Sequence, residues 1–238
     1  MNIALIGYGK MGKEIEKIAL QRGHTITLKV DVDNSTTYTI DDLKKADVAI
    51  EFSTPETAIN NIYKCFDAGV PIVVGTTGWL NKLEEVKQKC ADKKQTLFYT
   101  SNYSIGVNLF FKLNEYLAKM MNSFTGYNVS MEEIHHVHKL DAPSGTAISL
   151  ANIVIDQIDT KQKWVNETTD NSNELGIISK RIGEVPGTHT VTYSSDVDEI
   201  SLTHTAHNRK GFALGAVVAA EWVKAKQGVF GMNDLMNF

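Results

Sequence analysis

Residues 3–12, IALIGYGKMG, join a short apolar run to a G-x-G-x-x-G turn. The apolar run Ile3–Ile6 is typical of a strand that is buried on both faces of a sheet. After the turn, Ile15, Ile18 and Ala19 recur at helical spacing until Gly23 ends the pattern. The opening of the chain therefore predicts a strand, a tight glycine turn and a helix.

The three glycines of this turn have separate physical roles. Gly7 permits the sharp bend, Gly9 lets an anion approach the backbone, and Gly12 lets the helix pack closely on the strand. The free N–H groups and the macrodipole of the helix N-terminus favour a pyrophosphate there. Asp31 follows the next predicted strand, where a carboxylate accepts hydrogen bonds from ribose hydroxyls, and Asp33 is a second candidate. These features favour a dinucleotide site over the alternative, a glycine turn beside a solvated pair of acids.

Strands and helices alternate over the first hundred residues. Helices are predicted from Thr54-Pro55 to Gly69 and over Leu80–Cys90. The further strands are Thr25–Val30, Val48–Phe52, Pro71–Val74 and Thr96–Tyr99. This alternation predicts an α/β fold with a Rossmann-like, parallel, doubly wound sheet. The turn Gly75-Thr76-Thr77-Gly78 then lies at the carboxyl edge, where such sheets bind ligands, and is a candidate to contact the nicotinamide; an ordinary β-turn is the alternative.

The pattern changes after residue 104 and predicts a second, α+β domain with a mixed open sheet. The expected strands, three of them without intervening helices, are Tyr127–Ile134, Leu175–Arg181, His189–Ser194 and Glu199–His207. The expected helices are Val107–Met121, Ser144–Ile158 and Gly215–Lys226. The apolar face expected for the first of these helices consists of Leu109, Leu113, Leu117 and Met121. The polar stretch Asp159–Asn173 is predicted to be a loop, and the tail Gly228–Phe238 shows no clear period.

The composition is that of an ordinary globular protein, with 238 residues of which 42% are hydrophobic and 22% charged. The formal net charge of -4 gives no electrostatic reason to expect nucleic acid or an anionic membrane surface as a partner. No apolar run approaches the length that crosses a bilayer, and the N-terminus lacks the basic region and long apolar core of a signal peptide. A cytoplasmic location is therefore expected. Cys65 and Cys90 are expected to be buried free thiols without a functional role.

A dense group of proton donors ends the first strand of the second domain. Residues 133–139, EIHHVHK, hold three histidines and a lysine. A metal site and a basic surface cluster are two interpretations, but zinc sites usually add cysteine or carboxylate ligands at other spacings, and we expect no metal. Proton donation beside an anionic substrate explains the cluster better, because imidazole titrates near neutral pH.

The next motif, LDAPSGT over residues 140–146, leads into a helix. With Ser144 as N-cap, the backbone N–H groups of Gly145 and Thr146 are free in the first turn, and the Thr146 hydroxyl adds a donor. Such a helix N-terminus binds a carboxylate by the same physics as the pyrophosphate site. A substrate with two carboxylates would meet this cap together with the cationic His136 and Lys139.

The segment Glu133–Thr146, E-x-H-H-x-H-K-x-D-A-P-S-G-T, closely resembles the signature of the 4-hydroxy-tetrahydrodipicolinate reductase family, traditionally called dihydrodipicolinate reductase. The resemblance covers essentially the whole chain. Its further matching segments are Gly75–Gly78, Ser101–Asn108, Arg181–Glu184, Gly187–His189 and Gly228–Phe230. It implies an NAD(P)H-dependent oxidoreductase of the diaminopimelate route to lysine. Hydride would pass to C4 of (hydroxy)dihydrodipicolinate, a small cyclic dicarboxylate, to give tetrahydrodipicolinate.

The resemblance also implies roles for individual residues. His135 would be the catalytic acid/base and Lys139 the proton donor to the substrate. The residues implied to bind a substrate carboxylate are His136, Gly145 and Thr146. The residues implied to hold the cofactor are Gly7, Tyr8, Gly9, Lys10, Met11, Gly12, Asp31, Gly75, Thr76, Thr77, Thr100, Ser101, Asn102 and Tyr103.

The resemblance further implies how the domains and subunits are organised. A dinucleotide-binding domain would comprise residues 1–104 and 208–238, and a substrate-binding and oligomerisation domain residues 105–207. Hinges are expected near residues 102–106 and near Asn208. Family members are usually homotetramers joined through the sheets of the second domain, and a homotetramer is expected here.

Departures from the family pattern bear on cofactor preference. The glycine turn is one residue shorter than the commoner G-x-x-G-R-M-G, with Lys10 where arginine is frequent. Val32 and Val137 stand where many members carry arginine, and the brief loop Asn34–Tyr38 replaces a longer segment. Asp31 would repel the 2′-phosphate of NADPH, whereas Lys10 could attract it. We therefore expect both NADH and NADPH to work, with NADH at least equal.

Two alternatives remain open on the sequence. Another two-domain dehydrogenase, such as an aspartate or diaminopimelate dehydrogenase, would share the first domain and oxidise an amino acid with release of ammonia. A dinucleotide-sensing binding protein would lack the proton donors, yet His135 and Lys139 are present. The residues of the site favour the reductase.

Overall fold

The structure, a computed structural model, describes residues 1–208 and 210–238. Arg209, next to the hinge expected near Asn208, lies outside the described residues. The chain forms two compact units: unit 1 comprises Met1–Ile105 and Lys210–Phe238, and unit 2 comprises Gly106–Arg209. Unit 1 has a hydrophobic core on each face of its sheet, and unit 2 has a core of its own.

Unit 1 is built on a sheet in the strand order β11-β5-β4-β3-β1-β2, in which every neighbouring pair is parallel. Its strands are β1 Asn2–Ile6, β2 Thr25–Val30, β3 Val48–Glu51, β4 Ile72–Val74, β5 Thr96–Tyr99 and β11 Gly228–Phe230. Its helices are α1 Lys10–Gln21, α2 Ile40–Leu43, α3 Pro55–Ala68, the 3-10 helix η1 Leu80–Lys82, α4 Leu83–Asp92, α7 Lys210–Val223 and α8 Met232–Met236.

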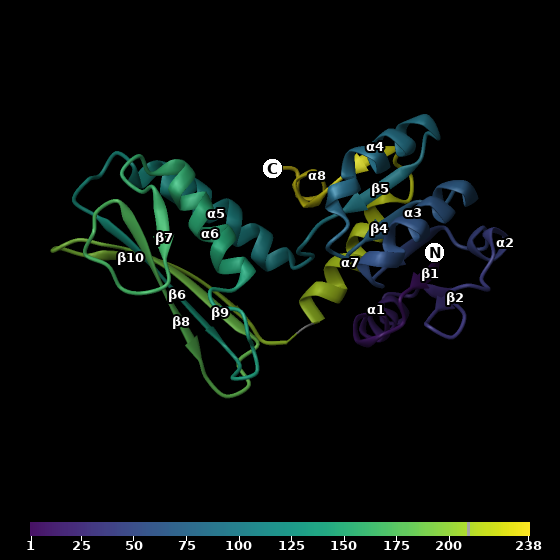
Figure 1. The fold of residues 1–238 in the computed structure, drawn as a ribbon, viewed down its shortest axis with the longest axis horizontal. Helices are drawn as coiled ribbons and strands as arrows, with labels where there is room; N and C mark the ends of the chain where they lie inside the picture. The colour runs from purple at the N-terminus through teal and green to yellow at the C-terminus, as the bar shows by residue number, and fades with distance from the viewer. Residues whose placement is uncertain (209) are drawn as a thin grey trace. The chain divides into compact units, whose positions relative to one another are not determined.

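Helices cover both faces of this sheet (Figure 1). Strand β1 sends Ile3 and Leu5 to the core formed with α1 and α7, and Ala4 and Ile6 to the core formed with α3 and α4. Because successive side chains alternate between two buried faces, the strand needs an unbroken apolar run. The Rossmann-like, doubly wound sheet predicted from the sequence is confirmed.

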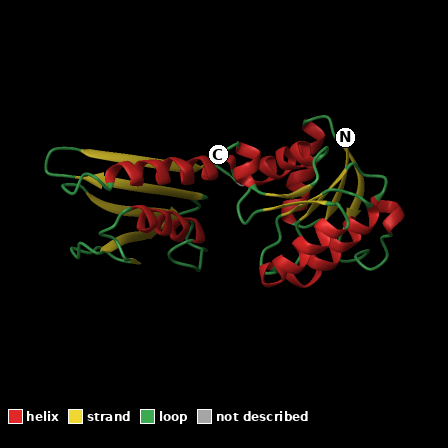
Figure 2. Cartoon of the chain, turned by 90° about the horizontal axis from the view of Figure 1, so that it is seen from above, coloured by secondary structure: helices red, strands yellow, loops and turns green. Residues whose placement is uncertain are grey.

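Unit 2 is built on a sheet in the strand order β10-β9-β6-β8-β7. Strand β6 runs parallel to β8 and antiparallel to β9, so the predicted mixed sheet is confirmed. Helices α5 and α6 lie on one side of it (Figures 1 and 2). The elements are α5 Ile105–Met121, β6 Asn128–His135, α6 Gly145–Gln157, β7 Lys163–Val165, β8 Glu174–Arg181, β9 Gly187–Ser194 and β10 Glu199–Ala206.

Several short helices and strands were not predicted from the sequence. The loop expected over Asp159–Asn173 contains β7, which pairs in parallel with β8. The tail Gly228–Phe238, which shows no clear period, forms β11, which pairs in parallel with β5, and then α8. Helix α7 also begins earlier than the expected Gly215, at Lys210. Strands β7 and β11 are too short for a periodic pattern and do not lie in an unbroken aliphatic run like that of β4, so pairing with a neighbour reveals them.

Helix α5 buries only part of the expected face. Met121 is buried and Leu117 packs against the core as expected, but Leu109 and Leu113 are 44% and 55% exposed, whereas Phe110 is buried. The buried face includes Asn114, whose side chain donates to the Leu150 carbonyl oxygen of α6 at 3.1 Å. A polar residue held by a hydrogen bond thus occupies a core position, which an apolar pattern does not predict.

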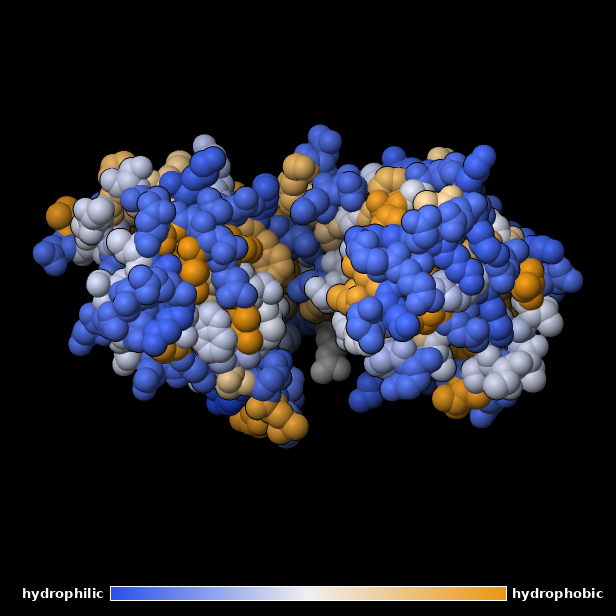
Figure 3. Space-filling view, turned by 45° about the horizontal axis from the view of Figure 1, so that its top comes forward, coloured by the Kyte–Doolittle hydropathy of each residue, from blue (hydrophilic) through white to orange (hydrophobic). Residues whose placement is uncertain are grey.

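The exposed apolar side chains are dispersed over the surface. Figure 3 shows hydrophobic residues on the viewed face as separate patches among hydrophilic ones. Val32 and Leu140 are among the most exposed of them. Within residues 1–208 and 210–238, no helix has both the length and the apolar character that a membrane span requires.

Candidate active site

The turn between β1 and α1 requires glycine at two positions. Gly7 has φ +92°, and a Cβ there would lie 2.0 Å from the Phe52 carbonyl oxygen. A Cβ at Gly12 would lie 2.3 Å from the Gly7 carbonyl oxygen, so this glycine lets α1 pack on the turn. Gly9 is the N-cap of α1, and a Cβ there would meet nothing within 4 Å. A ligand can therefore approach the backbone at Gly9, where α1 has no acidic residue in its first turn.

Two adjoining cavities of unit 1 border this turn, and Gly9, Phe52 and Ser53 line both. The first has a volume of about 370 Å³, and its lining includes Gly7, Tyr8, Asp31, Ser35 and Thr36. The second has a volume of about 390 Å³, and its lining includes Lys10, Met11, Gly75, Thr76 and Thr77. The glycine turn, the acid after β2 and the turn after β4 thus meet at one edge of the sheet, as the strand order requires.

Asp31 lies at the edge of the first cavity and is exposed. Its Oδ1 accepts a hydrogen bond from the Val32 N–H at 2.8 Å, and its own N–H donates to Asn34 Oδ1 at 2.7 Å. These bonds hold the short turn after β2. Val32, which stands where many family members carry arginine, is 83% exposed.

The turn Thr100–Tyr103 lines neither cavity within the described part of the chain. Tyr103 is buried; its hydroxyl donates to the Val74 carbonyl oxygen at 2.7 Å, and its ring centroid lies 5.6 Å from that of Phe52. Thr100 and Asn102 are half-buried and Ser101 is exposed. Tyr103 is thus hydrogen-bonded to the end of β4, the strand that leads into the turn at Gly75.

Glu51, the last residue of β3, was missed by sequence reasoning. Its side chain is fully buried, and its Oε1 accepts from the Ser53 N–H at 3.1 Å and from Asn61 Nδ2 at 3.4 Å. Burial raises the pKa of the Glu51 carboxyl, against the effect of these hydrogen bonds. The residue anchors Ser53, which lines both cavities. The signal in the sequence is an acid within the apolar run of residues 48–52.

In unit 2, strand β6 delivers Glu133 and His135 to the face that the helices cover, because residues two apart share a face. Glu133 is fully buried and His135 is 7% exposed. His135 Nδ1 lies 3.0 Å from Glu133 Oε2, although the contact does not have the geometry of an ideal hydrogen bond. The predicted catalytic histidine thus has a buried carboxylate as its neighbour.

Glu133 is surrounded by further donors. Its Oε1 accepts from the Ser144 N–H and from Arg181 Nη2, each at 3.1 Å. Burial raises the pKa of the Glu133 carboxyl, but the surrounding donors, His135 first, outweigh burial and hold that pKa well below its usual range. Glu133 is therefore an anion at neutral pH.

The N-terminus of α6 is capped as the sequence predicts. Ser144 is the N-cap, and its Oγ accepts from the Ala147 N–H at 3.2 Å. His189 Nε2 lies 3.0 Å from the same oxygen. Gly145 is exposed, a Cβ there would meet nothing within 4 Å, and the first turn of α6 contains no acidic residue. This end of α6 is open to an anion beside Gly145 and Thr146.

Arg181 ties the loop after β6 to this network. Its Nη2 also donates to the Asp141 carbonyl oxygen at 2.5 Å, and its Nε donates to the Lys139 carbonyl oxygen at 3.3 Å. Lys139 Nζ donates to both carboxylate oxygens of Asp141, at 2.8 and 2.9 Å. Arg181 and His189 were not expected as site residues, although the matching segments Arg181–Glu184 and Gly187–His189 contained the signal.

The other two histidines of the motif differ in their surroundings. His136 is half-buried, and its Nδ1 is buried without a hydrogen-bond partner among the described residues. His138 is exposed, and its Nε2 lies 3.1 Å from Glu184 Oε1. His136 is thus partly enclosed by the protein, whereas His138 belongs to the surface.

Glu133, His135 and His189 also form a donor set that could hold a metal ion, because their ligand atoms lie within 4.8 Å of one another. The Arg181 guanidinium already neutralises Glu133, and the Ser144 N–H occupies the same carboxylate oxygen. A cation added there would meet the charge of Arg181, so the arrangement suits a proton better than a metal.

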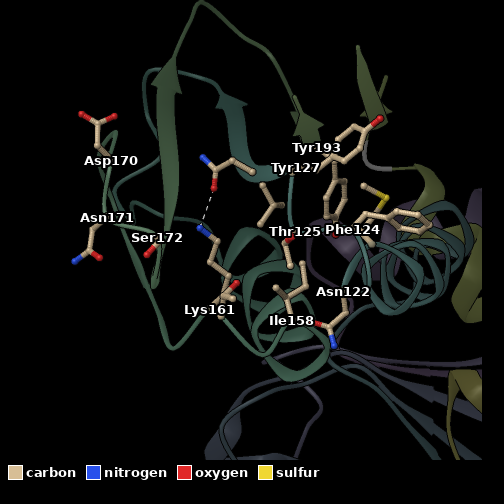
Figure 4. A pocket seen from close by; sticks show the side chains of 15 residues that line it. Asn122, Phe124, Thr125, Tyr127, Ile158, Lys161, Asp170, Asn171, Ser172 and Tyr193 are labelled. Atoms are coloured by element: carbon tan, nitrogen blue, oxygen red, sulfur yellow. Dashed lines mark hydrogen bonds between the residues drawn. The ribbon is translucent and has the colours of Figure 1, made fainter. Parts of the chain in front are cut away.

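A third cavity, of about 280 Å³, lies in unit 2 by the ends of α5 and α6 that are remote from His135 (Figure 4). Lys161 is buried there, and burial lowers the pKa of its ammonium group. Its Nζ donates to Asn128 Oδ1 at 2.9 Å, the dashed contact of Figure 4, and to the Glu174 carbonyl oxygen at 2.8 Å. Lys161 thus joins the loop before β7 to β6 and β8.

A dinucleotide turn on a doubly wound sheet, together with a separate unit that presents proton donors, defines a two-domain oxidoreductase that uses a nicotinamide cofactor. Models described as dihydrodipicolinate reductase, N-terminus, and dihydrodipicolinate reductase, C-terminus, match residues 1–103 and 106–236. The chain belongs to the dihydrodipicolinate reductase family.

Individual relatives agree with this family. The chain is 48% identical over 237 residues to a 4-hydroxy-tetrahydrodipicolinate reductase of Christiangramia forsetii, covering 100% of this chain and 98% of that protein. A protein of the same name from Neisseria gonorrhoeae is 33% identical over 232 residues, covering 93% of this chain and 83% of that protein. The fold matches a dipicolinate-bound dihydrodipicolinate reductase from Paenisporosarcina sp. TG-14 with a TM-score of 0.76 over 97% of each chain, at 21% identity. These matches confirm the resemblance seen in the sequence. They favour the reductase over the two alternatives, another two-domain dehydrogenase and a dinucleotide-sensing binding protein.

Proposed function

We propose that this enzyme is a 4-hydroxy-tetrahydrodipicolinate reductase, which reduces (hydroxy)dihydrodipicolinate to tetrahydrodipicolinate in the diaminopimelate route to lysine. The observation that carries the proposal is the network of unit 2, in which buried Glu133 joins His135 to the capped N-terminus of α6. The names of relatives at 48% and 33% identity support the same reaction.

The substrate dicarboxylate is bound by fixed dipoles and by cations. One carboxylate accepts hydrogen bonds from the N–H groups of Gly145 and Thr146 at the start of α6, where the helix dipole favours an anion. His136 is assigned to the substrate carboxylate by its place in the signature Glu133–Thr146. This arrangement selects a doubly anionic ring over a neutral one.

Proton transfer is assigned to His135 and Lys139. Hydride addition at C4 of the conjugated ring leaves electron density at the other end of the system, where a proton must arrive. Lys139, held by Asp141 in the loop that leads to α6, donates that proton to the substrate. His135 is the catalytic acid/base beside the buried carboxylate of Glu133.

The cofactor is assigned to the cavities of unit 1. Bound NADH or NADPH supplies the hydride for the reaction. Gly7–Gly12 hold the pyrophosphate at the N-terminus of α1, Asp31 accepts from the adenosine ribose, and Gly75–Thr77 contact the nicotinamide half. Residues 100–103 support this edge of the sheet, with Tyr103 bonded to Val74.

Oxidation of NADH and NADPH, followed by the loss of the reduced-nicotinamide absorbance, tests the proposal. The substrate is generated in situ from pyruvate and aspartate semialdehyde by its synthase. We expect oxidation that depends on the synthase product, with NADH at least as effective as NADPH. A folded protein that binds NADH but oxidises neither cofactor under these conditions would contradict the proposed reaction.

Replacing Asp31 with alanine is expected to weaken NADH binding about 10-fold and to leave NADPH binding nearly unchanged, because the carboxylate accepts from the ribose but repels a 2′-phosphate. Fluorescence titration of both cofactors measures the two dissociation constants. Asp41→Ala is the matched control, because Asp41 is an exposed acid of unit 1 that pairs with Lys44 and lines neither described cavity. An equal loss for NADH and NADPH would show that Asp31 does not discriminate between them.

We further propose that unit 1 is the dinucleotide-binding domain, that unit 2 binds the substrate, and that the enzyme is a cytoplasmic homotetramer joined through unit 2. The face of β9 and β10 opposite the helices supports the oligomer, because it presents a row of hydroxyl pairs. Thr190 and Thr203 are joined at 3.1 Å, and Thr192 and Ser201 at 2.9 Å. A light-scattering mass four times that of the chain is expected, and a monomeric mass would contradict the assembly.

A further inference from the structure

Glu133 is the point at which the proton-donating histidine and the substrate-binding helix meet. Its Oε2 lies 3.0 Å from His135 Nδ1, and its Oε1 accepts from the N–H of Ser144, the N-cap of α6. We propose that Glu133 is a positioning residue that acts through His135; this proposal rests on the proposed function. Its carboxylate faces Nδ1 of the His135 imidazole, which leaves Nε2 as the ring nitrogen available for acid/base catalysis, and its other oxygen holds the start of α6.

The charges around Glu133 support this role. The carboxylate is completely buried, and a buried anion needs a partner of opposite charge. Arg181 supplies one at Oε1, on the side of the loop that carries Lys139 and Asp141. His135 Nδ1 faces Oε2 at 3.0 Å, so the carboxylate favours the neutral tautomer that carries its proton on Nδ1.

His189 has a different part in the network. Burial first, and then the neighbouring His135, lower the pKa of His189 to about 4, so that it is neutral at neutral pH. Its Nε2 lies 3.0 Å from Ser144 Oγ and 3.8 Å from Glu133 Oε2. A neutral His189 packs edge-on against His135, with ring centroids 5.0 Å apart, and leaves the carboxylate to His135 and Arg181.

Gly187 leaves room for the imidazole. A Cβ at this position of β9 would lie 3.0 Å from His135 Nε2 and 3.3 Å from its Cδ2. A side chain at residue 187 would therefore crowd the edge of the ring that carries Nε2 and Cδ2. We expect this crowding to disturb the position of the ring beside Glu133.

The test replaces Glu133 with glutamine, which keeps the shape of the side chain but removes its charge. We expect kcat to fall by about 100-fold with little change in the KM of the substrate.

Glu132→Gln is the matched control, because Glu132 is adjacent in β6, points to the opposite face and pairs with Lys180 at 2.5 Å. It should leave kcat unchanged. Circular dichroism and NADH binding show whether the Glu133 variant is folded. If Glu133→Gln is folded and keeps the kcat of the unaltered enzyme, the proposal is wrong.

A measurement without turnover separates this proposal from the proposed function. Imidazole ¹⁵N NMR should show the proton of neutral His135 on Nδ1 in the unaltered protein, and loss of that preference in both Glu133→Gln and Gly187→Ala. The same spectrum in all three proteins would overturn the proposal even if the reductase assay succeeds. If the unaltered protein showed the Nδ1 signature but no reductase activity, the positioning would stand and the proposed reaction would fail.

A metal ion bound by Glu133, His135 and His189 would give a different experimental result. If Glu133, His135 and His189 held a catalytic cation, prolonged treatment with a chelator would abolish activity and one equivalent of zinc would restore it, which would overturn the positioning role. We expect chelation to leave kcat unchanged, because Arg181 already neutralises Glu133.

Discussion

Replacing Lys139 with alanine is expected to lower kcat by about 10²- to 10⁴-fold, the range that a positioned proton donor contributes. At about 1.4 kcal/mol for each factor of ten, this corresponds to roughly 3–5 kcal/mol of transition-state stabilisation. The ammonium group is held by Asp141 in the loop between β6 and α6, at the end of α6 that is open to an anion. Alanine removes the proton and leaves the loop anchored by Arg181, which contacts only the backbone of Lys139.

The Kd for NADH should not change in this variant, because Lys139 belongs to unit 2 and the glycine turn to unit 1. Steady-state turnover with synthase-generated substrate, beside a fluorescence titration of NADH, measures both quantities. Lys163→Ala is a suitable control, since Lys163 is an exposed lysine of unit 2 paired with Glu174 at 3.0 Å. Unchanged kcat in the Lys139 variant would remove this residue from the mechanism, and a rise in KM alone would make it a binding residue.

Replacing Gly9 with valine is expected to raise the Kd for NADH by about 100-fold while the protein stays folded. A Cβ at Gly9 meets nothing within 4 Å, so the side chain is accommodated and extends into space that borders both cavities. The pyrophosphate would then be kept from the N-terminus of α1. Losing one or two hydrogen bonds to a charged group, at about 1.5–3 kcal/mol each, accounts for an effect of this size.

The other two glycines of the turn would respond differently. A Cβ at Gly7 or Gly12 would lie within 2.3 Å of a backbone oxygen, so substitutions there damage the fold itself. Gly126→Val is the matched control for the Gly9 variant, because a Cβ at Gly126, in unit 2, also meets nothing within 4 Å. NADH binding that is unaffected by valine at residue 9, in a folded protein, would place the pyrophosphate elsewhere.

The first domain could be predicted in detail because its signals are local. The run Ile3–Ile6 and the glycines after it determine a strand, a turn and a helix from neighbouring residues alone. Parallel pairing then brings the carboxyl ends of the strands to one edge, so Asp31 and the Gly75 turn could be assigned to the same site as the glycine turn. Short strands such as β7 and β11 could not be predicted, since pairing and not periodicity defines them.

The second domain shows which features the sequence pattern of a single helix does not predict. The apolar residues of α5 suggested a buried face that included Leu109 and Leu113, yet these two are exposed while Phe110 and Asn114 are buried. An apolar residue can lie on the surface at little cost, whereas the buried amide of Asn114 donates to the Leu150 carbonyl oxygen of α6. That partner belongs to a different helix, and no pattern within α5 indicates it.

By itself, the sequence determined the fold class, the glycine turn, the cap at Ser144 and the histidine motif, because each depends on residues close together in the chain. Only the tertiary structure decided the surroundings of Glu133. His135 is its neighbour in β6, but Ser144, Arg181 and His189 come from α6, β8 and β9. Strand pairing and helix packing bring these groups within hydrogen-bond or ionic distance of one buried carboxylate. Since burial makes an unpaired charge costly, the partners of that carboxylate follow from the packing of the sheet and not from spacing along the chain.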